Sequence, residues 1–197
     1  HILVIEDNIG DYFLIEEYFS ENLFQHHLVQ VETFQEAKRR LSYKSEKWDA
    51  IFLDLSLPDH SGEGLIVDVL NMAIGVPVIA LTGFSDLEFS KKSLSLGVSD
   101  YLLKDELNST VLYKTLIYAI ERKKIISNLQ LSEKKYSDLF QLSPIPMLVY
   151  DQKSSLIIDV NQAAIEKYGY ARQEFQAISP MTLWKDPTFD NLSGFLK

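Results

Sequence analysis

The chain has 197 residues, a hydrophobic content of 46% and a formal net charge of −9 at pH 7, so it can form one large domain or two small ones. The negative charge argues against a nucleic-acid partner, and the absence of cysteine excludes disulfides, thiolate metal sites and a cysteine nucleophile. The apolar runs are too short to cross a bilayer and the N-terminus lacks a signal-peptide layout, so we expect a cytoplasmic protein with no membrane partner.

The first half of the chain alternates strand patterns with helix patterns. The predicted strands are 2–5, 27–31, 50–53, 76–81 and 101–103. Three predicted helices span 11–22, 63–73 and 86–96. A further helix begins with a capping box at Thr33 and Glu36, and a fifth begins near 108 or 109. This alternation predicts an α/β fold with a flavodoxin-like, doubly wound, five-stranded parallel sheet in the order 2-1-3-4-5.

Polar side chains follow four of the predicted strands. Glu6 and Asp7 follow the first strand, Asp54 the third, Thr82 the fourth and Lys104 the fifth. Because these strand ends meet at one edge of the sheet, the three carboxylates repel one another and need a cation. Without His or Cys beside them, the oxygen ligands favour Mg²⁺. With an ammonium and a hydroxyl nearby, the set predicts a phosphoryl-transfer site.

Each of these residues also has an ordinary explanation. Glu6 and Asp7 can cap the next helix, Asp54 and Thr82 can serve turns, and Lys104 can be a solvated cation. Because these polar residues occur together at four strand ends, a phosphoryl-transfer site is favoured over the separate ordinary explanations.

Four segments resemble a response-regulator receiver domain of two-component signalling over residues 1 to about 124. They are IED at 5–7, FLDLSLPDHSG at 52–62, ALTG at 80–83 and DYLLK at 100–104. The resemblance implies that Asp54 accepts a phosphoryl group from a phosphohistidine on a histidine kinase or phosphotransfer protein. It implies no further enzymatic activity here beyond this self-phosphorylation and a slow self-dephosphorylation.

The resemblance also implies a metal site. Asp7 and Asp54 would bind Mg²⁺ directly, the backbone carbonyl of Ser56 would be a further ligand, and Glu6 would act through water. The acidic pair is Glu-Asp where many relatives have Asp-Asp, a variant that we expect to keep Mg²⁺ binding.

The resemblance assigns the remaining site residues to the phosphoryl group and to switching. Thr82 and Lys104 would hold phosphoryl oxygens, and Tyr101 would be the aromatic switch that turns inward as Thr82 moves. Asp105 follows Lys104 where many relatives have proline, so we expect a different loop geometry there.

Two alternatives stay open. A degenerate, non-phosphorylated receiver would act as an interaction scaffold. A Mg²⁺-dependent phosphatase of the haloacid dehalogenase type also forms an aspartyl phosphate, but it needs two aspartates two residues apart after its first strand. Here Ser56 stands two residues after Asp54, and Asp54 follows the third strand, which disfavours the phosphatase.

A long helix is predicted from Ser109 to Leu142, because neither Gly nor Pro interrupts this segment. Its part 125–142 is the predicted signalling linker. Apolar residues there fall at alternating spacings of three and four, which is a weak heptad pattern and favours a homodimer. The heptad positions are Ile126, Leu129, Glu133, Tyr136 and Phe140, with Glu133 breaking the pattern.

Residues 143–197 form the third predicted region, a partial α+β domain with strands at 147–150 and 156–160 and helices at 161–168 and 172–177. Residues 132–197 are similar to the N-terminal part of a PAS domain. The residues that carry this resemblance are Asn161, the Ala163-Ala164 pair, 168–170 and 174–175. The chain lacks an initial Met and the later PAS strands, so we expect a fragment at both ends.

The resemblance to a PAS domain implies sensing or dimerisation. The acidic PAS-like segment stands where a regulator of transcription would carry a basic helix-turn-helix domain, which disfavours DNA binding. We expect the parent protein to be a hybrid sensor histidine kinase or another multidomain regulator. Kinase activity cannot be assigned to these residues.

Overall fold

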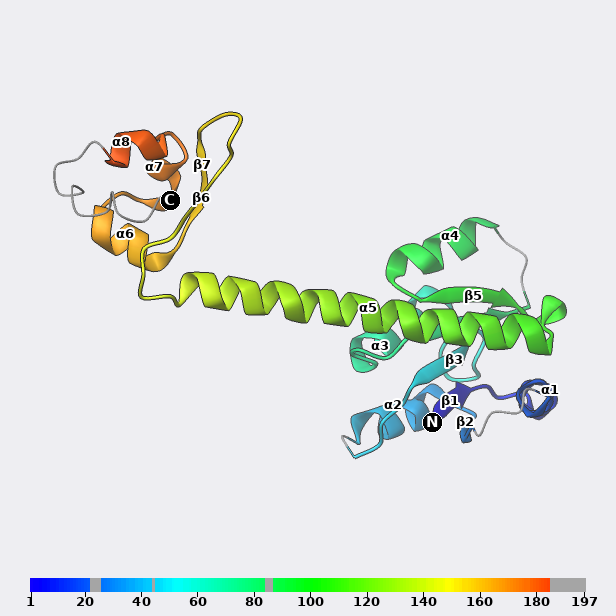
Figure 1. Ribbon diagram of the computed structural model, residues 1–197. Coiled ribbons are helices and arrows are strands. Elements are labelled where there is room, and N and C mark those ends of the chain that lie inside the picture. The colour runs from blue at the N-terminus through cyan, green and yellow to red at the C-terminus, as the bar shows by residue number, and fades with distance from the viewer. Residues whose placement is uncertain (22–25, 44, 84–86, 185–197) are drawn as a thin grey trace. The chain divides into compact units, whose positions relative to one another are not determined.

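The computed structural model describes residues 1–21, 26–43, 45–83 and 87–184 (Figure 1). The chain divides into two compact units, His1–Asn128 and Leu129–Lys197, and each is described by itself. The division falls inside the linker predicted at 125–142, and the domain boundaries 1–124 and 143–197 stay predictions.

The first unit is built on a five-stranded parallel sheet whose strand order is β2-β1-β3-β4-β5. This order confirms the predicted doubly wound α/β fold. The strands are β1 (Ile2–Ile5), β2 (Leu28–Val31), β3 (Ala50–Asp54), β4 (Val78–Thr82) and β5 (Asp100–Leu103).

Helices cover both faces of this sheet, which explains why its central strands are apolar up to the polar residues at their carboxyl ends (Figure 1). On β3, Phe52 packs in the cluster that contains residues of α1 and α5, and Leu53 packs in the cluster that contains residues of α2 and α3. The helices are α1 (Ile9–Ser20), α2 (Phe34–Ser42), α3 (Gly62–Met72), α4 (Leu87–Leu96), the 3-10 turn η1 (Lys104–Glu106) and α5 (Ser109–Gln141).

The N-terminus of α2 is capped as predicted, with one difference. The Thr33 side chain accepts a hydrogen bond from the N–H of Glu36 at 3.2 Å. The Glu36 carboxylate accepts from the N–H of Glu32 at 3.4 Å, one residue before the Thr33 N–H that a capping box uses. Asp59, in the loop after β3, accepts from the N–H groups of Phe34 and Gln35 and joins this loop to α2.

The helix α5 runs without interruption over 33 residues, which confirms the prediction from the absence of Gly and Pro. Its first turns pack on the sheet through Leu112, Leu116 and Ala119, which are buried. Among the described helices, none combines the length and the apolar character that a membrane crossing requires.

The second unit contains an antiparallel pair of strands, β6 (Leu148–Tyr150) and β7 (Ile157–Val160), followed by short helices. Ile157, Val160, Ala164 and Phe175 form the centre of its core. The predicted strands and the two predicted helices are confirmed, with ends that differ by one or two residues. The helices are α6 (Gln162–Tyr168), α7 (Arg172–Phe175) and α8 (Pro180–Trp184).

A single buried amide joins the start of this second unit to its sheet and to α6. The Asn161 oxygen accepts from the N–H groups of Met147 and Ala164, both at 2.9 Å. Its NH₂ group donates to the carbonyls of Ile145 at 2.8 Å and Ser143 at 3.3 Å. The fully buried side chain therefore uses its whole hydrogen-bonding capacity.

Replacement of Asn161 by alanine should destabilise the second unit by about 3 kcal/mol, because it removes the partners of four backbone groups. Native-state hydrogen exchange of the full chain measures this change and separates the two units. The control is Gln162→Ala, because Gln162 is exposed and its amide contacts only Glu166 among the described residues. Equal loss of protection in both variants would contradict the structural role of Asn161.

Candidate phosphoryl-transfer site

Three functional side chains extend from the same side of the sheet at its carboxyl edge. The residue two positions before each of Glu6, Asp54 and Lys104 packs in the same hydrophobic cluster, against α1 and α5. Because side chains alternate along a strand, Glu6, Asp54 and Lys104 follow on that side as well. The register of the parallel strands thus brings these residues together from β1, β3 and the end of β5.

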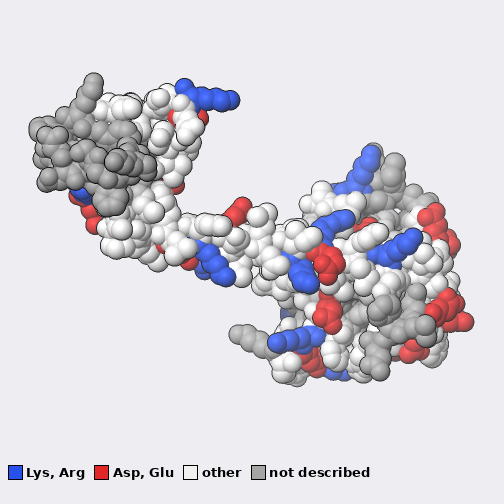
Figure 2. Space-filling model, viewed as in Figure 1, with Lys and Arg blue, Asp and Glu red and all other residues white. Residues whose placement is uncertain are grey.

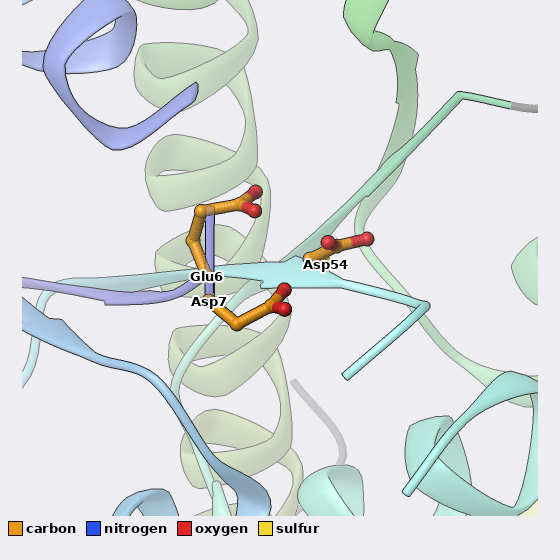
Figure 3. Close-up of side chains that lie close together, drawn as sticks. All are labelled: Glu6, Asp7 and Asp54. Carbon is orange, nitrogen blue, oxygen red and sulfur yellow. The ribbon is translucent and has the colours of Figure 1, made fainter. Parts of the chain in front are cut away.

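The predicted carboxylates of Glu6, Asp7 and Asp54 form one cluster, in which each offers an oxygen within 4.8 Å of the others (Figure 3). Glu6 and Asp54 are buried and Asp7 is exposed. An octahedral Mg²⁺ ion, with bonds of about 2.0–2.1 Å, holds its ligand oxygens roughly 3–4 Å apart. The all-oxygen donor set therefore suits a magnesium ion, for which the carboxylates would have to draw closer together, and the exposed Asp7 leaves the cluster accessible from solvent.

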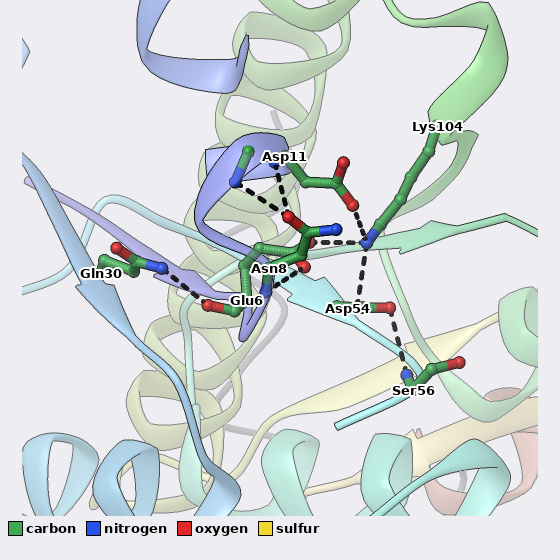
Figure 4. A network of polar contacts seen from close by, with 8 residues as sticks. Glu6, Asn8, Asp11, Gln30, Asp54, Ser56 and Lys104 are labelled. Carbon is green, nitrogen blue, oxygen red and sulfur yellow. Dashed lines mark hydrogen bonds and ion pairs between the residues drawn. The ribbon is translucent and has the colours of Figure 1, made fainter. Parts of the chain in front are cut away.

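Lys104 lies at the centre of a network of carboxylates (Figure 4). Its Nζ is 2.7 Å from Asp11 Oδ2, 2.8 Å from Glu6 Oε2 and 3.0 Å from Asp54 Oδ2. One ammonium is thus shared by three carboxylates, of which Glu6 and Asp54 also belong to the carboxylate cluster that could hold a metal ion. A further cation could balance the remaining negative charge.

The pKa values of Glu6 and Lys104 are shifted by burial and by the contacts between Lys104 and the carboxylates. Burial raises the pKa of Glu6 to about 7, although the contact with Lys104 and the N–H of Asn8 act in the opposite direction. Burial lowers the pKa of Lys104, but hydrogen bonds to Asp11, Glu6 and Asp54 outweigh it, and the net effect raises this pKa. Lys104 therefore stays charged, while Glu6 can carry a proton near neutral pH.

The Asp54 carboxylate is also held from its own loop. The N–H of Ser56 donates to Asp54 Oδ1 at 3.1 Å, while Oδ2 faces Lys104. The ligand role expected for Ser56 concerns its carbonyl and stays a prediction. Gly83 follows β4 directly, and an added Cβ there would meet no atom of the described residues within 4 Å.

The side chains of Thr82 and Tyr101 belong to the other face of the sheet, opposite to the face of Glu6, Asp54 and Lys104. Thr82 is buried at the end of β4, two residues after Ala80, and Ala80 pairs with Tyr101 on β5. Tyr101 is half-buried and packs against the cluster on that face. The two side chains therefore share a face of the sheet, and their roles in phosphoryl binding and switching stay predictions.

Asp11 and Asn8 were not among the site residues predicted from the sequence. Asn8 caps α1 by accepting from the N–H groups of Gly10 and Asp11, and Asp11 lies in the first turn of that helix. The available signal was position, because Asp11 lies four residues after Asp7, in the first turn of the helix that starts at the sheet edge. After Lys104, where a different loop geometry was expected, the chain forms the 3-10 turn η1.

Comparison with protein families gives two matches in this chain. Residues 2–116 match the response regulator receiver domain, and residues 134–196 match a PAS domain. Among curated relatives, the Probable transcriptional regulatory protein SilR of Salmonella typhimurium is 31% identical over 103 residues, covering 52% of this chain and 43% of SilR. The transcriptional regulatory protein CusR of Escherichia coli is 37% identical over 57 residues, covering 29% of this chain and 25% of CusR. The chain thus spans less than half the length of these relatives.

Solved structures give the same fold for the first unit. A response regulator receiver domain protein from Clostridium thermocellum has a TM-score of 0.54 and 25% identity, covering 64% of this chain and 97% of its own. A CheY-like receiver domain protein from Methanospirillum hungatei has a TM-score of 0.53 and 21% identity, covering 62% of this chain and 94% of its own.

The raised pKa of Glu6 predicts a pH dependence of stability for the metal-free protein. Between the ordinary value of 4.5 and about 7, the folded state binds a proton that the unfolded state releases. The free energy of unfolding should therefore fall as the pH rises through this window, by about 1–3 kcal/mol from this group. Glu6→Gln removes the titration, so urea unfolding in a chelator should show a smaller fall between pH 5 and pH 8.

The exposed Glu17 provides the matched control, because Glu17→Gln removes the same charge on α1 outside the network. A fall that is unchanged in Glu6→Gln, or equally reduced in both variants, would contradict this source of the pH dependence.

Proposed function

Because this chain belongs to the family of response regulator receiver domains, we propose that it is the phosphoacceptor module of a two-component phosphorelay. Asp54 accepts the phosphoryl group from a phosphohistidine of a histidine kinase or phosphotransfer protein. The observation that carries the proposal is the buried Asp54 carboxylate, 3.0 Å from the Lys104 ammonium and beside two further acidic side chains.

The chemistry is a phosphoryl transfer between two nucleophiles. A carboxylate oxygen of Asp54 forms a bond to phosphorus while the bond from phosphorus to the donor imidazole nitrogen breaks. The electron pair of that bond returns to the imidazole, and the product is an acyl phosphate. Lys104 and Thr82 hold the phosphoryl oxygens, and Tyr101 responds to the movement of Thr82.

A bound Mg²⁺ ion supplies positive charge that neutralises the phosphoryl oxygens. Asp7 and Asp54 would hold this ion, with the Ser56 carbonyl as a further ligand, and Glu6 would act through water. The geometric support is the oxygen cluster of Glu6, Asp7 and Asp54.

The helix α5 provides the route from the receiver to the PAS segment, and we infer that it also pairs with a second copy of the chain. Large apolar side chains stay exposed along one face of its C-terminal half, where a globular protein normally carries polar residues. Ile125, Ile126, Leu129, Tyr136 and Leu139 make up this face.

At the end of α5, Gln141 accepts a hydrogen bond from Arg172 at 2.9 Å, and Arg172 also pairs with Asp159 on β7. The guanidinium thus fixes the last turn of the helix to the PAS sheet. A displacement of the helix therefore acts directly on this sheet.

We assign the chain to a larger hybrid sensor histidine kinase or another multidomain regulator. The named relatives are transcriptional regulators, whereas a PAS domain follows the receiver here. Acidic and basic side chains are interspersed over the visible described surface of the first unit (Figure 2). This distribution favours a protein partner for the module over DNA.

Intact-mass analysis after incubation with acetyl phosphate and Mg²⁺ tests the phosphoacceptor role. The wild-type chain should gain one phosphoryl group, and the gain should disappear in Asp54→Asn and without Mg²⁺, because both the nucleophile and the metal are needed. The control is Asp68→Asn, because Asp68 is exposed on α3 and pairs only with His60 among the described residues. A wild type without any adduct would instead support the non-phosphorylated scaffold.

Sedimentation velocity tests the dimer. Leu129→Lys should weaken self-association about tenfold or more, because it places a charge in the middle of the apolar face. Leu131→Lys is a matched control, since Leu131 is 52% exposed against 58% for Leu129 but points about 200° away around the helix. A monomeric wild type, or equal effects of both substitutions, would contradict this interface.

A further inference from the structure

Three carboxylates engage the ammonium of Lys104 in this structure. Its Nζ donates hydrogen bonds to Asp11 at 2.7 Å and to Asp54 at 3.0 Å, and it forms an ion pair with Glu6 at 2.8 Å. A phosphoryl oxygen that binds Lys104 therefore competes with these carboxylates. Which of them gives way bears on how strongly the site holds a phosphoryl group.

Two of the three carboxylates are fixed in the site. Glu6 is fully buried, and it also accepts the N–H of Asn8. Asp54 is the acceptor itself, and its other oxygen is held by Ser56. Asp11 differs from both, because it lies on α1, outside the metal cluster, and its side chain is 36% exposed.

We propose that Asp11 is a positioning residue that competes with the phosphoryl group for the Lys104 ammonium and thereby limits how tightly the site holds that group. This inference rests on the proposed phosphorylation of Asp54. Asp11 accepts a charge-assisted hydrogen bond from Lys104 at 2.7 Å, so it is a direct competitor for the ammonium. Its partial exposure allows water to solvate the carboxylate when Lys104 turns to the phosphoryl group.

The negative charge of Asp11 should also weaken the binding of a phosphoryl group. Phosphorylation replaces the single negative charge of Asp54 by an acyl phosphate that carries up to two negative charges. Asp11 stays nearby and shares the same ammonium, so it opposes this increase. Removal of the Asp11 charge should then strengthen phosphoryl binding, chiefly by freeing Lys104.

The substitution Asp11→Asn is compatible with the fold. The cap of α1 uses the backbone N–H of Asp11 and the side chain of Asn8, so the helix start does not depend on the Asp11 carboxylate. Asparagine keeps the size of the side chain and removes the charge. The neighbouring Asp105→Asn is the control for loss of a negative charge, because Asp105 is exposed and follows Lys104 directly.

Calorimetric titration with beryllium fluoride, as a phosphoryl mimic, in the presence of Mg²⁺ tests the competition in the full chain. Asp11→Asn should bind about tenfold more tightly than the wild type, as expected when a charged hydrogen-bond competitor is lost. Asp105→Asn should stay within about twofold, since a charge exposed to solvent is screened. In a Lys104→Ala background, Asp11→Asn should change the affinity less than twofold, because the competition acts through Lys104.

A metal-free measurement checks the ion pair itself. In a chelator, the ¹⁵N signal of the Lys104 ammonium should be visible in the wild type through slow proton exchange, and it should broaden in Asp11→Asn. The same signal in both proteins would mean that Asp11 does not hold Lys104, and the proposal would be wrong.

The remaining outcomes separate the two proposals. If the wild type binds beryllium fluoride and Asp11→Asn binds it no more tightly, the role of Asp11 is refuted while the phosphoacceptor site stands. A gain that persists in the Lys104→Ala background would also refute it, because the effect would then come from charge alone. If the wild type binds no beryllium fluoride, the phosphoacceptor function itself fails.

Discussion

The need to balance buried negative charge at one edge of the sheet governs this structure. Glu6 and Asp54 are buried, Asp7 and Asp11 lie beside them, and Lys104 is the cation that the described residues place among them. Burying carboxylates costs free energy unless they are paired. One ammonium cannot balance four carboxylates, so the site keeps a demand for positive charge that a metal ion can meet. Burial is the main reason why the pKa of Glu6 is raised to about 7, and the neighbouring Asp54 carboxylate acts in the same direction.

The sheet makes this arrangement possible because the side chains on each face of its central strands pack into a separate cluster with different helices, and this packing fixes the register. A shift of one residue in β3 would move Asp54 to the other face and expose Phe52 to the wrong cluster. The carboxyl ends of β1, β3 and β5 thus bring together residues as far apart in sequence as Asp11 and Lys104, which are separated by 93 positions. The second unit uses a comparable device on a smaller scale, with the buried amide of Asn161 joining a loop, a strand and a helix.

Much of the fold could be predicted from the sequence, because apolar runs, helical spacing and strand-end residues are local signals. The strand order and the gathering of Glu6, Asp7, Asp54 and Lys104 followed from them. The contact of Asp11 with Lys104 could not, since it depends on how a flexible lysine crosses the sheet edge and on where the first turn of α1 lies. Asn161 was noted as a PAS marker, but its four hydrogen bonds appear only once the backbone of residues 143–147 is placed.

Chemical trapping of the acyl phosphate tests the central claim most directly. After incubation with a small phosphodonor and Mg²⁺, borohydride reduces an aspartyl phosphate to the corresponding alcohol, and peptide mass spectrometry locates the reduced side chain. The reduced side chain should be found at position 54 alone. Reduction at another carboxylate, or none in a protein that still binds Mg²⁺ through its acidic cluster, would contradict the assignment of Asp54 as the phosphoacceptor.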